Sequence, residues 1–435
     1  MRLLTATFTA RPQGLLQEPA KQASGKPSNS SAAIIARTGD VITILASIVP
    51  KLHLVLADND RIANAASSIS SNVVGPTFRS KAFPANVDAR FLELLYQLTR
   101  IQQAAKFWRK DLSDVLNDHR LFNSPVNLVQ ECWMAIFRQL TNNDKDRMPE
   151  LISRLPAPTT AGVVFGVGAT SARMEADRKT QANLRRIALI ILSCPLDTFI
   201  TDLGRLHEKL VELFGAKPVS APSSAIFPEV FIVLRAVILK MSGLHLTTIW
   251  PTINVELQKA ISSVLADNDT EEKYSNAAIL HACKLLDQLV TIEPDDFQLH
   301  EWLFITDTIE AVYKPATWTP TALADEVAEA LATIEIEGTS IMPHVQQLSA
   351  ITSSTGGRRR PFLDSILESL GDDVDLSDLR TLPKSELASR VLRPFLGQLS
   401  IVAFEETYGM LEPDVDACVH GVLTDLFDGN VSGEV

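Results

Sequence analysis

The sequence predicts an all-α protein, because three of its features favour helices over strands. Glycine is scarce, at 19 of 435 residues, and aromatic residues make up only 6%. A β-sandwich or barrel needs more turn residues and more alternating aromatic and β-branched side chains. Apolar residues instead recur at steps of three and four along the chain, which is the spacing of one helix face.

The predicted helices are short, and pairs of them recur over roughly 40 residues, the scale of HEAT and armadillo repeats. Prolines stand at their starts or bends, at Pro195, Pro251, Pro294, Pro320, Pro383 and Pro413. We therefore expect an α-solenoid of HEAT/armadillo-like helical repeats. This rests on element length and alternation alone, since the sequence carries no residue-level repeat signature. A compact multi-helix bundle is the alternative.

Composition divides the chain into five segments. Residues 1–32 are expected to form a mobile N-terminal segment, because residues 17–31 are rich in Lys, Ser, Pro, Ala and Gly. Residues 33–155 form the first part of the helical repeats. Residues 156–172 are a loop with several prolines and glycines. Residues 173–427 form the second part of the repeats, and residues 428–435 form a frayed tail.

The first half contains four clear helical patterns. An apolar run from residue 41 to residue 56 is broken at Pro50, and Phe91, Leu94, Leu95, Leu98 and Ile101 form one stripe over residues 87–101. Ser124-Pro125 starts a helix that runs through Trp133 and Phe137. Four leucines form a further stripe over residues 203–213.

The second half is more regular. Residues 226–239 are apolar nearly all round, which predicts an interior helix. Residues 279–290 predict an amphipathic helix. Further helices are expected from residue 319, over 343–351 and 362–370, over 387–402 with a kink at Pro394, and from residue 412 to residue 427.

The segment Phe297–Tyr313 predicts a helix after the start signal Glu293-Pro294-Asp295-Asp296. Trp302, Ile305, Ile309 and Val312 would share one face. A core stripe and an anchor for a partner have the same periodicity, so Trp302 is either a core residue or a partner anchor.

The net charge of −12 is unevenly distributed. Residues 1–200 contain 24 Lys and Arg against 16 Asp and Glu, whereas residues 201–435 contain 16 against 36. This asymmetry suggests an oriented contact with a membrane or a partner. Nucleic-acid binding is not expected, because the total charge is acidic and the basic residues are not interleaved with aromatic ones.

The cysteines do not form a site. Cys132, Cys194, Cys283 and Cys418 lie too far apart in sequence for a metal knuckle or redox pair, so we expect buried thiols. The N-terminus is a poor signal peptide, and no run reaches the ~20 apolar residues of a membrane span. A cytosolic protein, at most peripheral to a membrane, is expected.

No catalytic constellation accompanies these features. The glycine-rich segment 165–171 lacks the lysine of a phosphate loop and the third glycine of a dinucleotide fingerprint. The histidines have no metal-ligand spacing, and the acidic run 372–378 lacks the glycine and glutamate of an EF-hand. No serine has a nucleophile-elbow context. We therefore expect no enzyme, no cofactor and no metal. A hydrolase would need a convergent acid, base and nucleophile in the structure.

Two basic clusters are candidate sites for an anionic lipid or an acidic partner, because guanidinium groups match phosphate geometry. The first comprises Arg173, Arg178, Lys179, Arg185 and Arg186, and the second comprises Arg358, Arg359 and Arg360 in an exposed-looking loop.

Several segments together resemble the C-terminal region of the Dopey family. They are Phe227-Pro228-Glu229-Val230-Phe231, Leu246-Thr247-Thr248-Ile249-Trp250-Pro251, Tyr274-Ser275-Asn276, Ala282-Cys283-Lys284-Leu285-Leu286-Asp287 and Phe297-Gln298-Leu299-His300-Glu301-Trp302-Leu303-Phe304-Ile305-Thr306-Asp307, with Asn72-Val73-Val74-Gly75-Pro76-Thr77-Phe78-Arg79-Ser80-Lys81 as a further match. These are packing motifs rather than catalytic signatures.

The resemblance implies a C-terminal fragment of a large cytosolic scaffold, peripheral on Golgi and endosomal membranes. The implied partners are a large exchange-factor-like Golgi scaffold and a phospholipid flippase, with links to phosphoinositides and kinesin. A homodimer is a further possibility. The resemblance supplies no catalytic residues. We therefore expect a non-enzymatic scaffold or adaptor in membrane traffic, with a phosphoinositide-binding membrane-docking module as the alternative.

Overall fold

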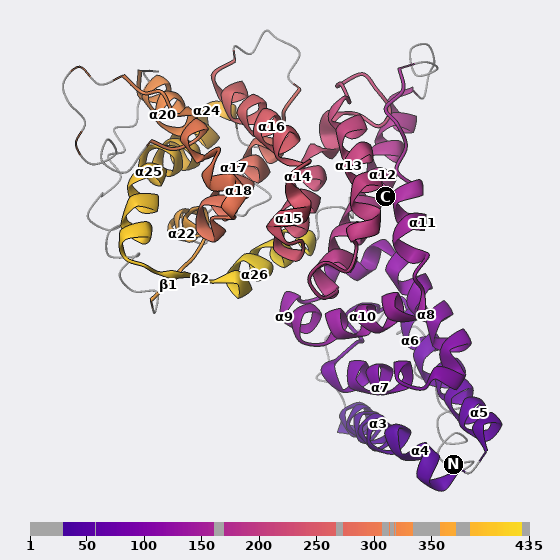
Figure 1. Ribbon diagram of the computed structural model, residues 1–435. Helices are drawn as coiled ribbons and strands as arrows, with labels where there is room; N and C mark the ends of the chain where they lie inside the picture. The colour runs from indigo at the N-terminus through magenta and orange to yellow at the C-terminus, as the bar shows by residue number, and fades with distance from the viewer. Residues whose placement is uncertain are drawn as a thin grey trace. The chain divides into compact units, whose positions relative to one another are not determined.

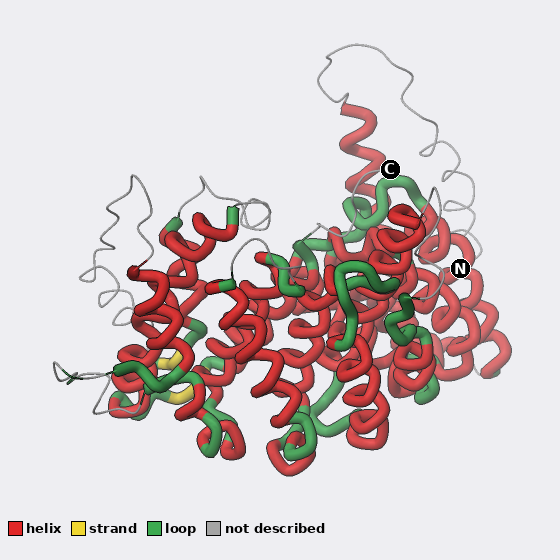
Figure 2. Tube along the Cα trace, turned by 90° about the horizontal axis from the view of Figure 1, so that it is seen from above, coloured by secondary structure: helices red, strands yellow, loops and turns green. Residues whose placement is uncertain are grey.

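The computed structural model describes residues 29–56, 58–160, 169–266, 273–306, 313, 317, 319–333, 357–370 and 383–428. This part of the chain is all-α, as predicted: helices joined by loops, with two strands of two residues each (Figures 1 and 2). It divides into two compact units. Unit 1 comprises Met1–Arg147 and Phe427–Val435, and unit 2 comprises Met148–Leu426.

Most helices of unit 1 are short, although the first, α3, has 20 residues. They are α3 (Asn29–Ile48), α4 (Leu52–Val55), α5 (Asn59–Ile69), α6 (Gly75–Arg79), α7 (Ala89–Thr99), α8 (Ala105–Asn117), α9 (Val126–Leu128) and α10 (Met134–Asn143), with the tighter or wider turns η1 (Val49–Lys51), η2 (Ser70–Val74), η3 (Gln102–Ala104), η4 (His119–Asn123) and η5 (Val129–Trp133) between them. The helix α11 (Arg147–Ser153) begins at Arg147, the last residue of the N-terminal segment of unit 1.

An aromatic cluster forms the centre of unit 1. The Phe78 ring packs edge-on against Phe91, with centroids 5.5 Å apart, and Trp133 stacks on Phe137 at 5.3 Å. The predicted stripe on α7 is confirmed, because its apolar residues are buried. Asp88 fixes where α7 begins, since its side chain accepts a hydrogen bond from the Phe91 amide at 2.9 Å.

Unit 2 contains longer helices. They are α12 (Ala169–Ser193), α13 (Ile200–Phe214), α14 (Phe227–Lys240), α15 (Gly243–Leu246), α16 (Trp250–Ser262), α17 (Asn276–Ile292), α18 (Asp295–Gln298), α20 (Leu323–Thr333), α22 (Phe362–Ser369), α24 (Lys384–Leu387), α25 (Arg393–Tyr408) and α26 (Val415–Leu426), with η6 (Ser224–Ile226), η7 (Ser263–Leu265), η8 (Glu301–Leu303) and η9 (Ala388–Leu392), and the parallel strands β1 (Arg358–Arg359) and β2 (Glu412–Pro413).

The helix α14 is the central element of unit 2. It packs against α12, α13, α17 and α26 (Figure 1), and every residue from Phe227 to Leu239 is buried. The predicted interior helix is therefore confirmed. Pro228 lies in its first turn, where the missing amide hydrogen costs nothing.

The helix α17 differs from its prediction. It was expected to be amphipathic, but residues 278–291 are all buried, the polar ones included. The reason is that its polar face packs against α14, against α22 and against a charged side chain of α26. It does not face solvent, as described below.

In two helical stretches, a proline comes just after a π-turn. Pro76 and Pro394 each lie in the first turn of an α-helix that continues a π-turn, η2 and η9 respectively. A proline cannot donate the i→i−4 hydrogen bond, and the wider turn shifts the bonding pattern at that point. Where a kink was predicted at Pro394, the structure has this π-turn directly before the proline-containing turn.

The predicted helix over Phe297–Tyr313 is wrong where the structure describes it. Residues 295–298 form the single turn α18 and residues 301–303 form the 3₁₀ turn η8. The backbone groups that would continue the helix have tertiary partners: the Phe304 carbonyl accepts from the Ala324 amide at 2.9 Å, and the Thr306 amide donates to Ser400 Oγ at 3.1 Å. Ile309 and Val312 lie outside the described residues.

Smaller differences occur at the element boundaries. The helix α3 begins at Asn29 and α12 begins at Ala169, while residues 1–28 and 161–168 lie outside the described residues, as does the helix expected over 343–351. Arg358 and Arg359, expected in a loop, form β1. Within the other expected loop, residues 156–172, Thr159 forms an antiparallel bridge with Ala221.

Among the described residues, one helical stretch, Thr38–Val55, is long and apolar enough by composition to cross a membrane, and 28% of it is buried. Core helices of soluble proteins pass the same test. Here Leu45, Val49 and Leu52 are buried in unit 1, where α3 and η1 contact α7.

Candidate anion-binding site

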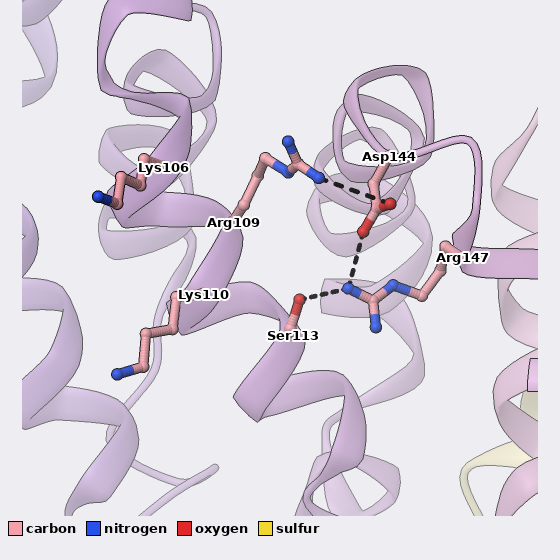
Figure 3. Close-up of a pocket in the computed structure, with 6 residues that line it drawn as sticks. All are labelled: Lys106, Arg109, Lys110, Ser113, Asp144 and Arg147. Carbon is pink, nitrogen blue, oxygen red and sulfur yellow. Dashed lines mark hydrogen bonds and ion pairs between the residues drawn. The ribbon is translucent and has the colours of Figure 1, made fainter. Parts of the chain in front are cut away.

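A shallow cleft in unit 1 gathers basic side chains. Its volume is about 330 Å³, and it is lined by Lys106, Arg109, Lys110, Ser113, Asp144 and Arg147 (Figure 3). Four of these side chains are cationic at neutral pH and one is anionic. The cleft therefore carries a net charge of about +3.

One helix provides four of the lining residues. Lys106, Arg109, Lys110 and Ser113 stand at steps of three and four on α8, so they share one helix face. The opposite face of α8 is held in the core by Trp108, Leu112, Val115 and Leu116, which are buried. Asp144 follows directly after α10, and Arg147 is the first residue of α11.

The carboxylate of Asp144 orders both arginines. Arg147 Nη2 lies 2.9 Å from Asp144 Oδ2 and donates to Ser113 Oγ at 2.6 Å. Arg109 Nη2 lies 3.5 Å from Asp144 Oδ1. The Arg147 side chain is 9% exposed and that of Arg109 is 40% exposed, so Arg147 forms the recessed part of the cleft and Arg109 its accessible part.

The lysines lie on the rim. Both are exposed, and Figure 3 shows Lys106 and Lys110 extending from α8 with their ammonium groups turned away from Asp144. A lysine has a flexible stem with a charged head, so these heads can swing toward a bound anion. The cleft thus combines fixed guanidinium groups with mobile ammonium groups.

This chemistry suits binding rather than catalysis. Guanidinium and ammonium groups are the usual ligands of phosphate and carboxylate groups. Within the described residues, no group of three or more His, Cys, Asp or Glu side chains is placed to hold a metal ion.

The sequence analysis did not identify this site, although a signal was present. Lys106, Arg109, Lys110 and Ser113 show the spacing of a helix face. Asp144 and Arg147, however, are more than 30 residues away in sequence, and only the packing of α10 on α8 brings them together.

The first predicted basic cluster lies on one helix but does not form one surface. All five residues belong to α12, where Arg178 and Lys179 are exposed and Lys179 pairs with Glu175 at 3.1 Å. Arg173 donates to the Pro218 carbonyl at 3.3 Å, and Arg186 is partly exposed.

The surface role predicted for Arg185 is corrected. Its side chain is 2% exposed, lies 3.2 Å from Glu229 Oε1 through Nη2, and donates through Nη1 to the Leu426 carbonyl at 2.7 Å. These contacts join α12 to α14 and to the end of α26. Arg185 therefore serves the core of unit 2.

The second predicted cluster is likewise divided. Arg359 is buried and pairs with Glu293 at 2.7 Å, so its predicted surface role is also corrected. Arg360 pairs with Asp414 at 2.8 Å while remaining half-exposed. Arg358 is exposed and lies in β1, opposite Glu412 of β2.

Trp302 is 68% exposed, which decides against its role as a core residue. The buried aromatic residues of the same segment are Phe297 and Phe304, whose rings stack with centroids 6.2 Å apart. Leu299, at 71%, is a second exposed apolar side chain on this turn.

A charged network lies inside unit 2. Asp425 of α26 forms ion pairs with Arg235 of α14 and with Lys284 of α17, the latter at 2.5 Å. Burial alone would raise the pKa of Asp425, but the charges of Lys284 and Arg235 hold it well below its usual value. Gln288 completes the network by accepting from Arg235 Nε at 3.1 Å.

A second buried carboxyl lies nearby on α17. Asp287 accepts hydrogen bonds from the Phe362 and Leu363 amides at 3.0 and 2.8 Å and so caps α22 from another helix. Burial raises its pKa to about 8.

The buried thiols do not have the chemistry of nucleophiles. Cys194, Cys283 and Cys418 are buried, as expected, whereas Cys132 is only partly so. Burial raises the pKa of Cys283 well above its usual value and that of Cys418 to about 12. A reactive cysteine needs a lowered pKa.

Fold and site together define an all-α protein with a charged core and a basic surface cleft. The family model described as DOP1 C-terminal matches residues 1–409. Protein dop1 of Emericella nidulans is 44% identical over 430 residues, covering 98% of this chain and 22% of that protein. Protein DOP1 of Saccharomyces cerevisiae is 24% identical over 376 residues, covering 84% and 20%. No solved structure matches the chain.

The chain therefore belongs to the DOP1 family, and the resemblance found in the sequence is confirmed. It spans about a fifth of the length of these two relatives.

Proposed function

We propose that this chain is a non-enzymatic scaffold or adaptor segment in Golgi–endosome membrane traffic, which binds partner proteins through its helical surface. Membership of the DOP1 family supports this proposal. The proposed partners are a large exchange-factor-like Golgi scaffold and a phospholipid flippase, and the proposed location is cytoplasmic, peripheral on Golgi and endosomal membranes. We further propose that the helices stack as HEAT/armadillo-like repeats.

The exposed pair Leu299 and Trp302 is the observation that carries the scaffold proposal. Exposed tryptophans on a rigid support are typical hot spots of protein interfaces. Here the support is rigid, because the buried rings of Phe297 and Phe304 hold the turn from the inside, and Trp250 packs on Phe297 at 6.2 Å. The turn therefore presents a pre-ordered apolar anchor.

The test is the double substitution Leu299→Ala and Trp302→Ala. Because both side chains are exposed, the melting temperature should change little, while capture of the proposed trafficking partners from a lysate should fall at least tenfold. Leu196→Ala with Val211→Ala, two other exposed apolar residues of unit 2, is the matched control and should leave capture intact. Unchanged capture by the Leu299/Trp302 variant would count against the anchor.

A second candidate function is docking on phosphoinositide membranes. It is favoured by exposed apolar and basic side chains in unit 1: Leu54 and Val55 are 73% and 78% exposed, and Phe107, at 41%, adjoins Lys106. Membrane-surface segments combine these two kinds of side chain.

Liposome flotation at low and at physiological salt tests this function. Binding to phosphoinositide vesicles that weakens with salt, and that Leu54→Ser with Val55→Ser reduces, is the expected result. No binding at either salt concentration would leave recruitment by partner proteins as the route to membranes.

A further inference from the structure

We propose that the exposed pair Leu299 and Trp302 binds a segment of a partner protein that combines leucine or aromatic side chains with arginines or lysines. The inference rests on the scaffold proposal and goes further by naming the chemistry of the partner. Both side chains belong to residues 293–306, here called the anchor turn, which also contain α18 and η8.

The anchor turn is acidic, which is the first argument. It contains one histidine, no lysine or arginine, and the four carboxylates Glu293, Asp295, Asp296 and Glu301. Asp295 is exposed, and Asp296 accepts a hydrogen bond from Trp250 Nε1 at 3.1 Å. That indole is neutral, so the contact does not neutralise the charge of Asp296. A cationic segment is therefore complementary to the anchor turn, and an anionic one is repelled.

The end of α25 extends this acidic surface. Thr407 Oγ1 donates to Glu293 Oε1 at 3.0 Å, which places the last turn of α25, with Glu405 and Glu406, beside the anchor turn. Burial raises the pKa of Glu406 to about 7, and the charge of Arg359 lowers this pKa while the carboxylates of Glu293 and Glu405 raise it. Two carboxylates thus oppose one cation around Glu406. A cation of a partner would reduce this repulsion.

The apolar part of the site suits arginine as well as leucine. Leu299 and Trp302 are 71% and 68% exposed, so both can be covered by a partner. The face of a tryptophan attracts a guanidinium group, and the same group can form two parallel hydrogen bonds with a carboxylate. An apolar side chain gains free energy when it is buried against Leu299. A segment with both kinds of side chain therefore uses the whole surface.

The same acidic surroundings disfavour two other occupants. The negative surface of an anionic membrane would be repelled by the carboxylates of the anchor turn. A purely apolar segment would cover Leu299 and Trp302 but would leave the neighbouring carboxylates without a complementary charge, which costs specificity and affinity.

The test is calorimetric titration of the 435-residue chain with a synthetic amphipathic peptide of leucine and arginine. Binding should weaken as salt rises from low to physiological concentration, because exposed charges contribute to it. Leu299→Ala with Trp302→Ala should weaken binding about tenfold or more. Asp295→Lys with Glu405→Lys should also weaken it, although the apolar pair is intact. Both carboxylates are exposed, so the melting temperature should change little.

Two control variants match these changes elsewhere in unit 2. Leu196→Ala with Val211→Ala removes two exposed apolar side chains, and Glu208→Lys with Glu212→Lys reverses two exposed charges on α13. Both should bind the peptide as the unaltered chain does. An equal loss of binding in these controls, or no binding of the peptide even at low salt, would overturn the site.

Further ligands test the chemistry of the occupant. The same peptide with glutamate in place of arginine should not bind, and equal affinity would overturn the cationic partner in favour of a purely apolar one. A peptide of serine and arginine should bind much more weakly, and equal affinity would remove the apolar pair from the site. Self-association of the chain that Trp302→Ala abolishes would replace the partner protein by a second copy of this chain.

Failure of this inference differs from failure of the scaffold proposal. If Asp295→Lys with Glu405→Lys leaves capture of the proposed trafficking partners intact, while Leu299→Ala with Trp302→Ala abolishes it, the anchor stands and its cationic partner is overturned. If the peptide binds as expected but neither variant changes that capture, the surface has the stated chemistry and the scaffold proposal for these partners falls.

Discussion

At the scale of single residues, the buried charges of unit 2 are the least replaceable feature. Asp425 is 4% exposed and serves as counter-charge to both Arg235 and Lys284, which are 3% and 7% exposed. A buried ion pair often adds little net stability, but removal of one partner leaves an uncompensated charge in a medium that cannot solvate it. Variants that break the network therefore lose folding stability.

Asp425→Ala should lower the free energy of unfolding by roughly 3–5 kcal/mol, because two buried cations lose their partner. Denaturant unfolding measures this. Asp416→Ala, at an exposed position on the same helix, should change it by less than about 0.5 kcal/mol. If the two variants unfolded at the same denaturant concentration, the network would not contribute to the stability of the fold.

Raising the pH from 5 to 8 should lower stability. Asp287 and Glu406 have pKa values raised to about 8 and about 7, chiefly by burial, so these two carboxyls bind more protons in the folded chain than in the unfolded chain across this range. When the folded state binds more protons, stability falls as pH rises. The melting temperature of Asp287→Asn, which cannot ionise, should fall less steeply with pH; an identical slope would contradict this account.

The residues of this network could not be predicted from sequence. On α17 the apolar stripe was readable, but His281, Lys284, Asp287 and Gln288 looked like a solvated face. Their burial depends on partners far along the chain, since Lys284 and Asp425 are 141 residues apart. Charge type alone also misplaced Arg185 and Arg359 on the surface, because a sequence does not show which arginine has a glutamate opposite it in the fold.

At the scale of elements, the spacing of apolar residues predicted helices reliably where one face of a helix packs against one core. The helices α7 and α13 have the buried stripes that their sequences indicate, and α14, which is apolar nearly all round, is buried from Phe227 to Leu239. The segment after Pro294 shows the opposite case. Its apolar residues have the three- and four-residue spacing of a helix. In the structure, however, the buried rings of Phe297 and Phe304 lie on or next to single turns, and tertiary hydrogen bonds replace the helical ones.

Asp325 fixes the end of that segment. Its Oδ2 accepts from Thr306 Oγ1 at 2.5 Å and from Ser400 Oγ at 2.8 Å, which ties the segment to α20 and α25. Asp325→Ala should cost about 1–3 kcal/mol and should accelerate hydrogen exchange at the Thr306 amide. Its exposed neighbour Glu326→Ala is the control. Equal protection of the Thr306 amide in both variants would show that the segment is held by its aromatic residues alone.

At the scale of the whole molecule, the chain forms two units, and each has its own aromatic or aliphatic core. Composition predicted all-α structure and a charge difference between the halves. It did not predict that the division falls at residue 147, since no composition shift marks that point and the expected loop began at residue 156. It also did not predict that Phe427, near the other end of the chain, packs on Phe122 in unit 1 at 5.3 Å.

Separate cores predict separate unfolding. Calorimetry should resolve two transitions, because compact units with their own cores tend to unfold independently. Phe137→Ala in unit 1 and Phe231→Ala in unit 2 should each cost roughly 3–5 kcal/mol and shift a different transition by roughly 10 °C. A joint shift of one transition by either variant would mean that the two units melt cooperatively.

The place of Asp425 so late in the chain has a consequence for biosynthesis. Helices α14 and α17 are made well before α26, yet Arg235 and Lys284 receive their counter-charge only when residue 425 has been added. Asp425 follows Lys284 by 141 residues and Arg235 by 190. Synthesis proceeds at about 5–20 residues per second, so the nascent helices wait about 7–40 seconds with two cations that cannot be buried. A ribosome that stops before residue 425 therefore releases a product with an unfinished core, a substrate for the cell's quality control.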